Sequence, residues 1–213
     1  MKGPRVGVVD YGAGNILNVL RALQHLGASP QLVSSAEVLG NLDGIVIPGV
    51  GAFGAGMQGL RESGMDNAVR TRVEKGTPVL AICLGMQLLA ESSEESPGVP
   101  GLGIVDGHVR NLRALDSAVS ALRVPDTGWA SVVFSRNSLG FSAERQESFY
   151  FSHSYYLVPS DDSLISGFKL RGSIRIPVFL EQENVIAAQF HPEKSGPVGV
   201  ALIDSWITTK LSK

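Results

Sequence analysis

The first half of the chain alternates short apolar runs with stretches whose apolar residues recur at helical spacing. After the first run, such residues recur up to Gly27, and helical spacing returns over 57–75 with an interruption near Gly64. The expected strands are residues 5–10, 31–34, 44–47 and 78–82. Apolar strands that lack a clean period-two alternation and are separated by helices are typical of a parallel sheet covered on both faces.

The second half changes character, because its expected strands are not separated by long helices. These strands are residues 129–134, 148–157, 176–181 and 185–190. A helix over 198–211 follows them, and residues 111–125 are ambiguous. The sequence therefore predicts an α/β fold in which a largely parallel open sheet, flanked by helices, gains mixed or antiparallel strands in its second half. The Gly/Pro-rich stretch 96–103 is the best candidate for an internal boundary, but without a flexible linker we expect residues 1–213 to form a single domain.

Composition excludes several classes of function. Net charge is −2 with no basic run, which argues against nucleic-acid binding and against an anionic membrane surface. We find no apolar run near the ~18 residues that span a bilayer and no signal-like stretch at the N-terminus, so we expect a cytoplasmic protein. Cys83 is the only cysteine and the four histidines lie far apart, so we expect no disulfide and no metal.

The turn after the first expected strand resembles a dinucleotide-binding fingerprint but does not complete it. Gly12 and Gly14 fit, whereas Leu17 stands where the third glycine belongs, and the sequence contains no GK[ST] phosphate loop. We therefore expect no cofactor. The acidic group Glu91, Glu94 and Glu95 is interpreted as a solvated helix end.

Cys83 is the strongest candidate for a reactive side chain. An apolar strand runs directly into it, a helix begins at once, and small residues (Ala81 and Gly85) lie two positions to either side. This is the pattern of a nucleophile elbow, with cysteine in place of serine. The N-terminus of the following helix favours the thiolate. The alternative is a lone buried cysteine that acts as a small hydrophobe.

His191 is the candidate general base. It ends an expected strand, and Glu193 stands two residues further on, where a carboxylate can orient the imidazole. The carboxyl ends of strands in an open parallel sheet meet at one edge, so Cys83 and His191 can share that edge. Together these residues would form an activated-thiol relay. A histidine at a strand end is otherwise an ordinary surface residue.

A third segment offers an oxyanion hole. Gly49 and Gly51 flank Val50, which frees the backbone to aim the Val50 N–H at a ligand, and the Leu84 N–H directly follows the nucleophile. Two such amides can stabilise the oxyanion formed in acyl transfer. The alternative is a simple turn at the end of a strand.

Four segments together resemble one protein family. They are residues 10–15 (DYGAGN), 48–53 (PGVGAF), 83–87 (CLGMQ) and 191–195 (HPEKS). With them, the chain resembles, from about residue 5 to 211, the class I (triad-type) glutamine amidotransferases and, among these, the glutaminase subunits of imidazole glycerol phosphate synthase.

The resemblance implies a role for each matching residue. Cys83, His191 and Glu193 would be the triad, and the Val50 and Leu84 amides would bind the oxyanion. The residues expected to bind glutamine are Gly49, Gly51, Gln87, Ser154 and Tyr155. The residues expected to face a separate TIM-barrel cyclase subunit, which receives the ammonia in a heterodimer, are Asn15, Trp129, Tyr150 and Lys194. Core packing is the alternative for Trp129 and Tyr150.

The chain departs from the family pattern on both sides of Trp129. Asp126 stands where the family usually has histidine, and Ala130 where it usually has asparagine. The implied activity is hydrolysis of glutamine through a cysteine thioester, with ammonia delivered to the cyclase in histidine biosynthesis. The alternatives are a glutaminase subunit for amino-sugar synthesis, a free-standing cysteine hydrolase acting on another amide, and a regulatory module with a dead site.

Overall fold

The computed structural model describes residues 3–12, 14, 16–115 and 124–211. Its helices are α1 (Ile16–His25), α2 (Phe53–Glu62), α3 (Met65–Glu74), α4 (Leu84–Leu88) and α5 (Gly196–Trp206). The strands are β1 (Arg5–Val9), β2 (Ser29–Val33), β3 (Gly44–Ile47), β4 (Val79–Ile82), β5 (Ser92–Ser93), β6 (Gly107–Asn111), β7 (Asp126–Phe134), β8 (Gln146–His153), β9 (Tyr155–Pro159), β10 (Ile165–Arg171), β11 (Ile174–Gln182) and β12 (Val185–Ala188).

Two sheets organise these strands within the described residues. The large one has nine strands in the order β2-β1-β3-β4-β12-β11-β10-β7-β8, and the small one pairs β5, β6 and β9. From β2 to β12 all pairs are parallel, and from β12 to β8 all are antiparallel. The change from a parallel to an antiparallel half confirms the predicted fold class.

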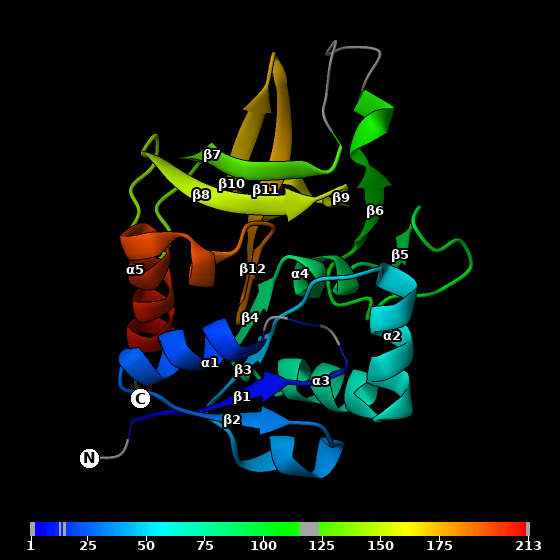
Figure 1. The fold of residues 1–213 in the computed structure, drawn as a ribbon, viewed down its shortest axis with the longest axis vertical. Helices are drawn as coiled ribbons and strands as arrows, with labels where there is room; N and C mark the ends of the chain where they lie inside the picture. The colour runs from blue at the N-terminus through cyan, green and yellow to red at the C-terminus, as the bar shows by residue number, and fades with distance from the viewer. Residues whose placement is uncertain (1–2, 13, 15, 116–123, 212–213) are drawn as a thin grey trace.

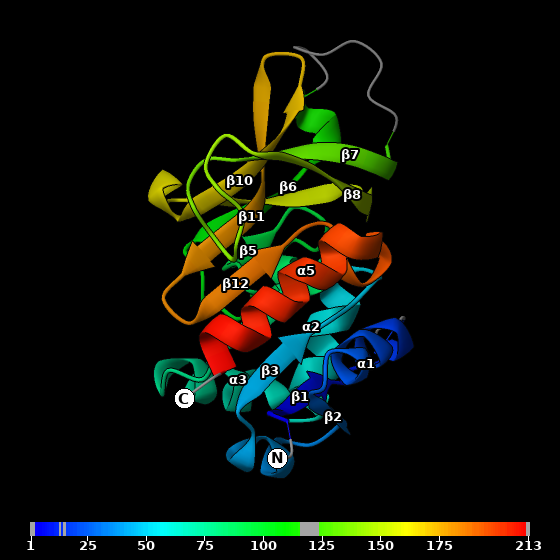
Figure 2. The ribbon, with the colours of Figure 1, turned by 90° about the vertical axis from the view of Figure 1, so that its left-hand side faces the viewer.

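Helices cover both faces of the parallel half. Figure 1 shows α1 and α5 on one side and α2, α3 and α4 on the other, and Figure 2 shows α5 and α1 from the front. Val19, Trp206 and other apolar side chains pack under α1 and α5, whereas Phe53, Met57 and their neighbours form a second core under α2 and α3. Apolar side chains on both faces explain why strands such as β4 lack alternation.

The structure differs from the sequence-based expectation at several elements. Residues 148–157 form two strands in different sheets, β8 and β9, and β5, β6 and β10 were not predicted. The break near Gly64 was expected, and Gly64, with φ of 67°, does separate α2 from α3. Residues 207–211 form a π turn after α5. The ambiguous stretch includes a short 3₁₀ turn at 112–115, while its residues 116–123 lie outside the described part.

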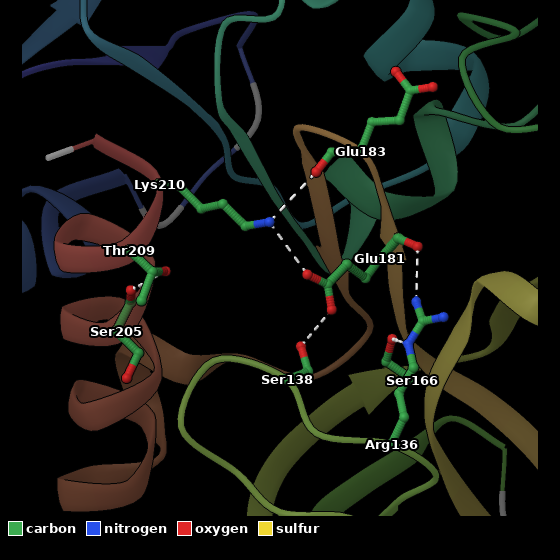
Figure 3. A network of polar contacts seen from close by, with 8 residues as sticks. All are labelled: Arg136, Ser138, Ser166, Glu181, Glu183, Ser205, Thr209 and Lys210. Atoms are coloured by element: carbon green, nitrogen blue, oxygen red, sulfur yellow. Dashed lines mark hydrogen bonds and ion pairs between the residues drawn. The ribbon is translucent and has the colours of Figure 1, made fainter. Parts of the chain in front are cut away.

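A polar network ties the end of the chain to the antiparallel half (Figure 3). The Glu181 carboxylate accepts hydrogen bonds from Ser138 Oγ at 2.6 Å and from Lys210 Nζ at 3.2 Å. Arg136 donates to the Glu181 carbonyl oxygen at 3.0 Å and to Ser166 Oγ at 2.7 Å. These bonds join the loop after β7, strands β10 and β11 and the C-terminal turn. None of these residues lines the candidate active site described next.

Candidate active site

Cys83 lies in a sharp turn between β4 and α4. Its φ of 52° and ψ of −106° are rare for a residue with a side chain. The turn brings α4 so close to β3 that a Cβ on Gly85 would lie 1.9 Å from the Ile47 carbonyl oxygen, so only glycine fits there. The Cys83 N–H donates to the Ala188 carbonyl at 2.7 Å, which fixes the turn against β12. This geometry is that of a nucleophile elbow.

His191 follows β12, the strand beside β4, so the two candidate reactive residues come from adjacent strand ends. Its Nδ1–H donates to Glu193 Oε1 at 2.9 Å, and both side chains are almost fully buried. Nε2 is buried without a hydrogen-bond partner among the described residues. The structure therefore brings the three predicted triad residues together, with one ring nitrogen held by the carboxylate and the other left for Cys83.

The electrostatics of His191 fit this arrangement. Burial lowers its pKa, but interactions with Cys83 and then Glu193 outweigh burial and raise the pKa to about 9. His191 therefore holds a proton at neutral pH while it lies beside the sulfur. A neighbouring imidazolium favours the nucleophilic thiolate form of a cysteine.

A cavity of about 220 Å³ opens in front of the Cys83 sulfur. It is smaller than the ~300 Å³ at which typical drug-sized sites begin, and its size suits a single amino acid. The lining residues are Val50, Gly51, Cys83, Leu84, Gln87, Glu95, Pro125, Ser152, His153, Ser154 and Tyr155. Of the residues predicted to bind glutamine, the lining includes all except Gly49.

Gln87 is held in place at this cavity by two hydrogen bonds. Its Nε2 donates to the Tyr155 carbonyl at 2.8 Å and to Gln189 Oε1 at 3.2 Å. Gln189 Nε2 in turn lies 3.7 Å from Cys83 Sγ. Gln189 was not predicted, although it stands two residues before His191.

Glu95 corrects an expectation. The sequence suggested a solvated helix end, whereas the carboxylate lines the cavity and accepts a hydrogen bond from the Phe53 N–H at 2.7 Å. The chain after α4 folds back through β5, and this tertiary turn, which the local pattern does not reveal, brings Glu95 to the site. A carboxylate in the cavity can bind the ammonium group of an amino acid.

His153 is a second lining residue that the sequence analysis missed. Its Nδ1–H donates to the Tyr155 carbonyl at 2.9 Å, and burial lowers its pKa to about 4. The imidazole is therefore neutral at pH 7. It lies next to Ser154 and Tyr155, which the resemblance had marked, so the neighbouring motif was the available signal.

The oxyanion segment, residues 48–51, adopts an orientation that blocks one of the two predicted donors. The Leu84 N–H donates to the Gly49 carbonyl at 3.3 Å. In a trans peptide the C=O and the following N–H point in opposite directions, so the Val50 N–H points away from Leu84. Both predicted donors are at the site, but this backbone does not form an oxyanion hole.

Three of the four residues predicted to face a partner form a cluster. Trp129 and Tyr150 pack edge to face with ring centroids 6.3 Å apart, and Lys194 Nζ lies 5.7 Å from the Tyr150 ring centre. Trp129 is 58% exposed, so core packing does not explain it. Tyr150 also contacts the His191 ring, which connects this surface to the triad. Asn15 lies outside the described residues.

Asp126, one of the two departures near Trp129, is not a surface residue. It is buried beside Lys169, itself 3% exposed, and its carboxylate pairs with Lys169 Nζ and, at 2.5 Å, with Arg171. Burial raises the pKa of Asp126, but the hydrogen bonds from Arg171 and Lys169 lower it by a larger amount, so the pKa falls below its ordinary value. The substitution is thus accommodated by an internal ion pair, while Ala130 is half-buried.

Similarity to known proteins identifies the class to which this chain belongs. The family model for class I glutamine amidotransferases matches residues 7–206. Two solved structures share the fold: one titled as a glutamine amidotransferase (TM-score 0.74, 23% identity, 97% of this chain and 98% of that one) and PurLQS from Thermotoga maritima (TM-score 0.76, 22% identity, 98% and 99%). The chain belongs to the class I glutamine amidotransferase family.

Curated relatives narrow the assignment within that family. The imidazole glycerol phosphate synthase subunit HisH of Herpetosiphon aurantiacus is 39% identical over 98% of this chain and 96% of its own length. The HisH subunits of Geobacillus thermodenitrificans (38%; 95% and 94%) and Acinetobacter baylyi (39%; 95% and 97%) are similar over nearly full length. These matches confirm the expectation of a glutaminase subunit of this kind. No helix in the described part of the chain is long and apolar enough to cross a membrane.

Proposed function

We propose that the chain hydrolyses glutamine to glutamate and ammonia and passes the ammonia to a TIM-barrel cyclase partner. The partner would form imidazole glycerol phosphate and an aminoimidazole carboxamide ribotide. The observation that carries the proposal is the Cys83 elbow, which opens on a cavity the size of an amino acid and lies beside the His191–Glu193 pair. The proposed pathway is inferred from the relatives, which are HisH subunits of imidazole glycerol phosphate synthase.

The chemistry follows from these positions. Cys83 Sγ attacks the side-chain amide carbon of glutamine, and the proton on His191 goes to the nitrogen that leaves as ammonia. Water then hydrolyses the thioester, with His191 taking its proton and Glu193 holding the imidazole in place. Glutamate leaves and Cys83 is regenerated.

Substrate orientation is assigned to other polar groups that line the cavity. Glu95 would bind the α-ammonium group of glutamine, while Gln87 and the backbone at Ser154 and Tyr155 would bind its remaining polar groups. Trp129, Tyr150 and Lys194 would face the cyclase and border the exit for ammonia.

One assay separates this function from the alternatives. Glutamate release from glutamine is measured for the chain alone and with the cyclase subunit of the same organism loaded with its ribotide ligand. We expect slow release alone and strong stimulation in the complex. Stimulation only by an amino-sugar synthase barrel would redirect the pathway. Fast hydrolysis of other amides without any partner would indicate a free-standing hydrolase, and no release under any condition would indicate a dead site.

A further inference from the structure

Tyr11 is a buried tyrosine whose hydroxyl is committed to the oxyanion segment. It follows β1, and its O–H donates to the Pro48 carbonyl at 2.5 Å. Burial and the charge at Cys83 both raise the pKa of Tyr11 far above its ordinary value, so the hydroxyl remains a donor at every physiological pH. The bond is made to the residue directly before the Gly49–Val50 peptide, whose carbonyl blocks Leu84.

The other end of the same segment is also anchored. The Phe53 N–H donates to the Glu95 carboxylate at 2.7 Å, and the Gly54 N–H donates to Ser96 Oγ at 3.0 Å. Residues 49–52 thus span two fixed points. Gly51, with φ of 133°, has a backbone conformation that side chains rarely permit, and glycine at both 49 and 51 keeps this span free to rotate.

There is room beside the span for such a rotation. A cavity of about 120 Å³ lies between Tyr11, Val50 and Leu84 and the start of α2. A Cβ added at Gly14 would lie 3.5 Å from a Val50 methyl group, so the segment after β1 borders Val50 as well as Pro48. Val50 therefore borders two cavities, the active-site cavity and this smaller one.

We propose that Tyr11 is a positioning residue for the oxyanion hole, because its hydroxyl fixes the Pro48 carbonyl and confines any reorientation to the Gly49–Val50 peptide. With that carbonyl held, a turn of the peptide delivers the Val50 N–H next to the Leu84 N–H. Without it, the whole segment shifts and the two donors no longer converge on one oxygen. The inference rests on the proposed function, since it concerns the same reaction.

The variant Tyr11→Phe removes the hydroxyl and keeps the ring. The first measurement is amide hydrogen exchange at Leu84 in the isolated chain. One lost hydrogen bond of about 1.4 kcal/mol corresponds to a tenfold change, so exchange at Leu84 should accelerate about tenfold, with core amides of β12 unchanged. This measurement needs no partner.

The second measurement is glutaminase kinetics in the complex with the ribotide-loaded cyclase. We expect kcat to fall about 10- to 100-fold, as follows misplacement of a catalytic group, while KM for glutamine stays within about twofold. In the isolated chain the same variant should lower kcat less, because the Leu84 donor is already blocked there. Tyr156→Phe is the matched control: it removes a hydroxyl from another buried tyrosine, in the small sheet, and should change neither exchange at Leu84 nor kcat.

The outcomes are separable from those of the proposed function. If the cyclase fails to stimulate the wild-type chain, the proposed pairing fails, while Leu84 exchange still decides the role of Tyr11. Unchanged exchange at Leu84 would overturn the inference. So would exchange that accelerates equally throughout the core, or a rise in KM with kcat intact, since either would indicate a merely structural role.

Discussion

The two walls of the active-site cavity differ in how far they are prepared for catalysis. On the triad wall, Cys83 and His191 extend from neighbouring strands of the central sheet, and Glu193 already holds the imidazole at 2.9 Å. On the oxyanion wall, the Gly49 carbonyl occupies the Leu84 N–H that the reaction needs. The side chains that attack the substrate are in position, whereas the two amides that would stabilise the resulting oxyanion are not.

The difference follows from what each wall is made of. The triad side chains are packed in a dense interior, where rearrangement is costly. The oxyanion wall is a short backbone span with two glycines and a second cavity beside it. A partner that binds the turned peptide more tightly shifts the population by its differential affinity. One oxyanion donor is worth roughly 10² to 10³ in kcat, so this wall can regulate the rate without disturbing the triad.

The largest expected effect comes from removing the nucleophile. Cys83→Ala should reduce glutamine hydrolysis by about 10⁴- to 10⁶-fold, because a nucleophile and its base act as a unit. Glutamine binding should survive, because Gln87 and the other expected contacts lie elsewhere in the cavity. Turnover and binding are measured by glutamate release and by calorimetry. Substantial turnover by this variant would refute the mechanism.

The next-largest effect distinguishes the roles of His191 and Glu193 within the triad wall. His191→Asn should lower kcat nearly as much as the loss of Cys83 does. Glu193→Gln should lower kcat less, because the carboxylate orients the base and does not react. The measurement is kcat for both variants in the same complex, with melting temperatures as the control for folding. A milder loss at His191 than at Glu193 would reverse the assigned roles.

The oxyanion wall is tested by fixing its backbone. Gly49→Pro should abolish stimulation by the cyclase, a loss of roughly 10²- to 10³-fold, because proline locks φ and constrains the residue before it. Slow basal hydrolysis should persist, since the triad is untouched. Gly49→Ala is the matched control: Gly49 has no positive φ in the described backbone, so alanine suits this conformation, does not lock the torsion and should keep more of the stimulation than proline does. If the wild-type chain is as fast alone as in the complex, the segment is only a turn.

The same contrast explains what the sequence could predict. The elbow at Cys83 is a local device, and small residues such as Gly85 are required within a few positions of it, so the pattern is visible in one stretch of sequence. Glu193 likewise lies two residues from His191. The orientation of the Gly49–Val50 peptide leaves no trace in the sequence, because glycine permits either state.

Features set by tertiary contacts were missed for a related reason. β10 places Lys169 in the interior, where a binary pattern expects an apolar residue, because Asp126 of β7 neutralises it across the sheet. Glu95 reaches the cavity only through the fold of the chain after α4. Such positions depend on partners distant in sequence, which local periodicity does not register.

The smallest expected effect uses pH to separate the walls. The pKa of His191 is raised to about 9, so the proton that leaves with ammonia is present below that pH and is lost above it. We expect kcat/KM to fall about tenfold per pH unit above about 9, in the isolated chain and in the complex alike. The oxyanion wall contributes backbone amides, which do not titrate, so the stimulation factor should stay constant from pH 6.5 to 9. Glu193→Gln should move the alkaline limb to lower pH, because one group that raises the His191 pKa is gone. A stimulation factor that changes across this range would mean that a titrating side chain controls the oxyanion wall.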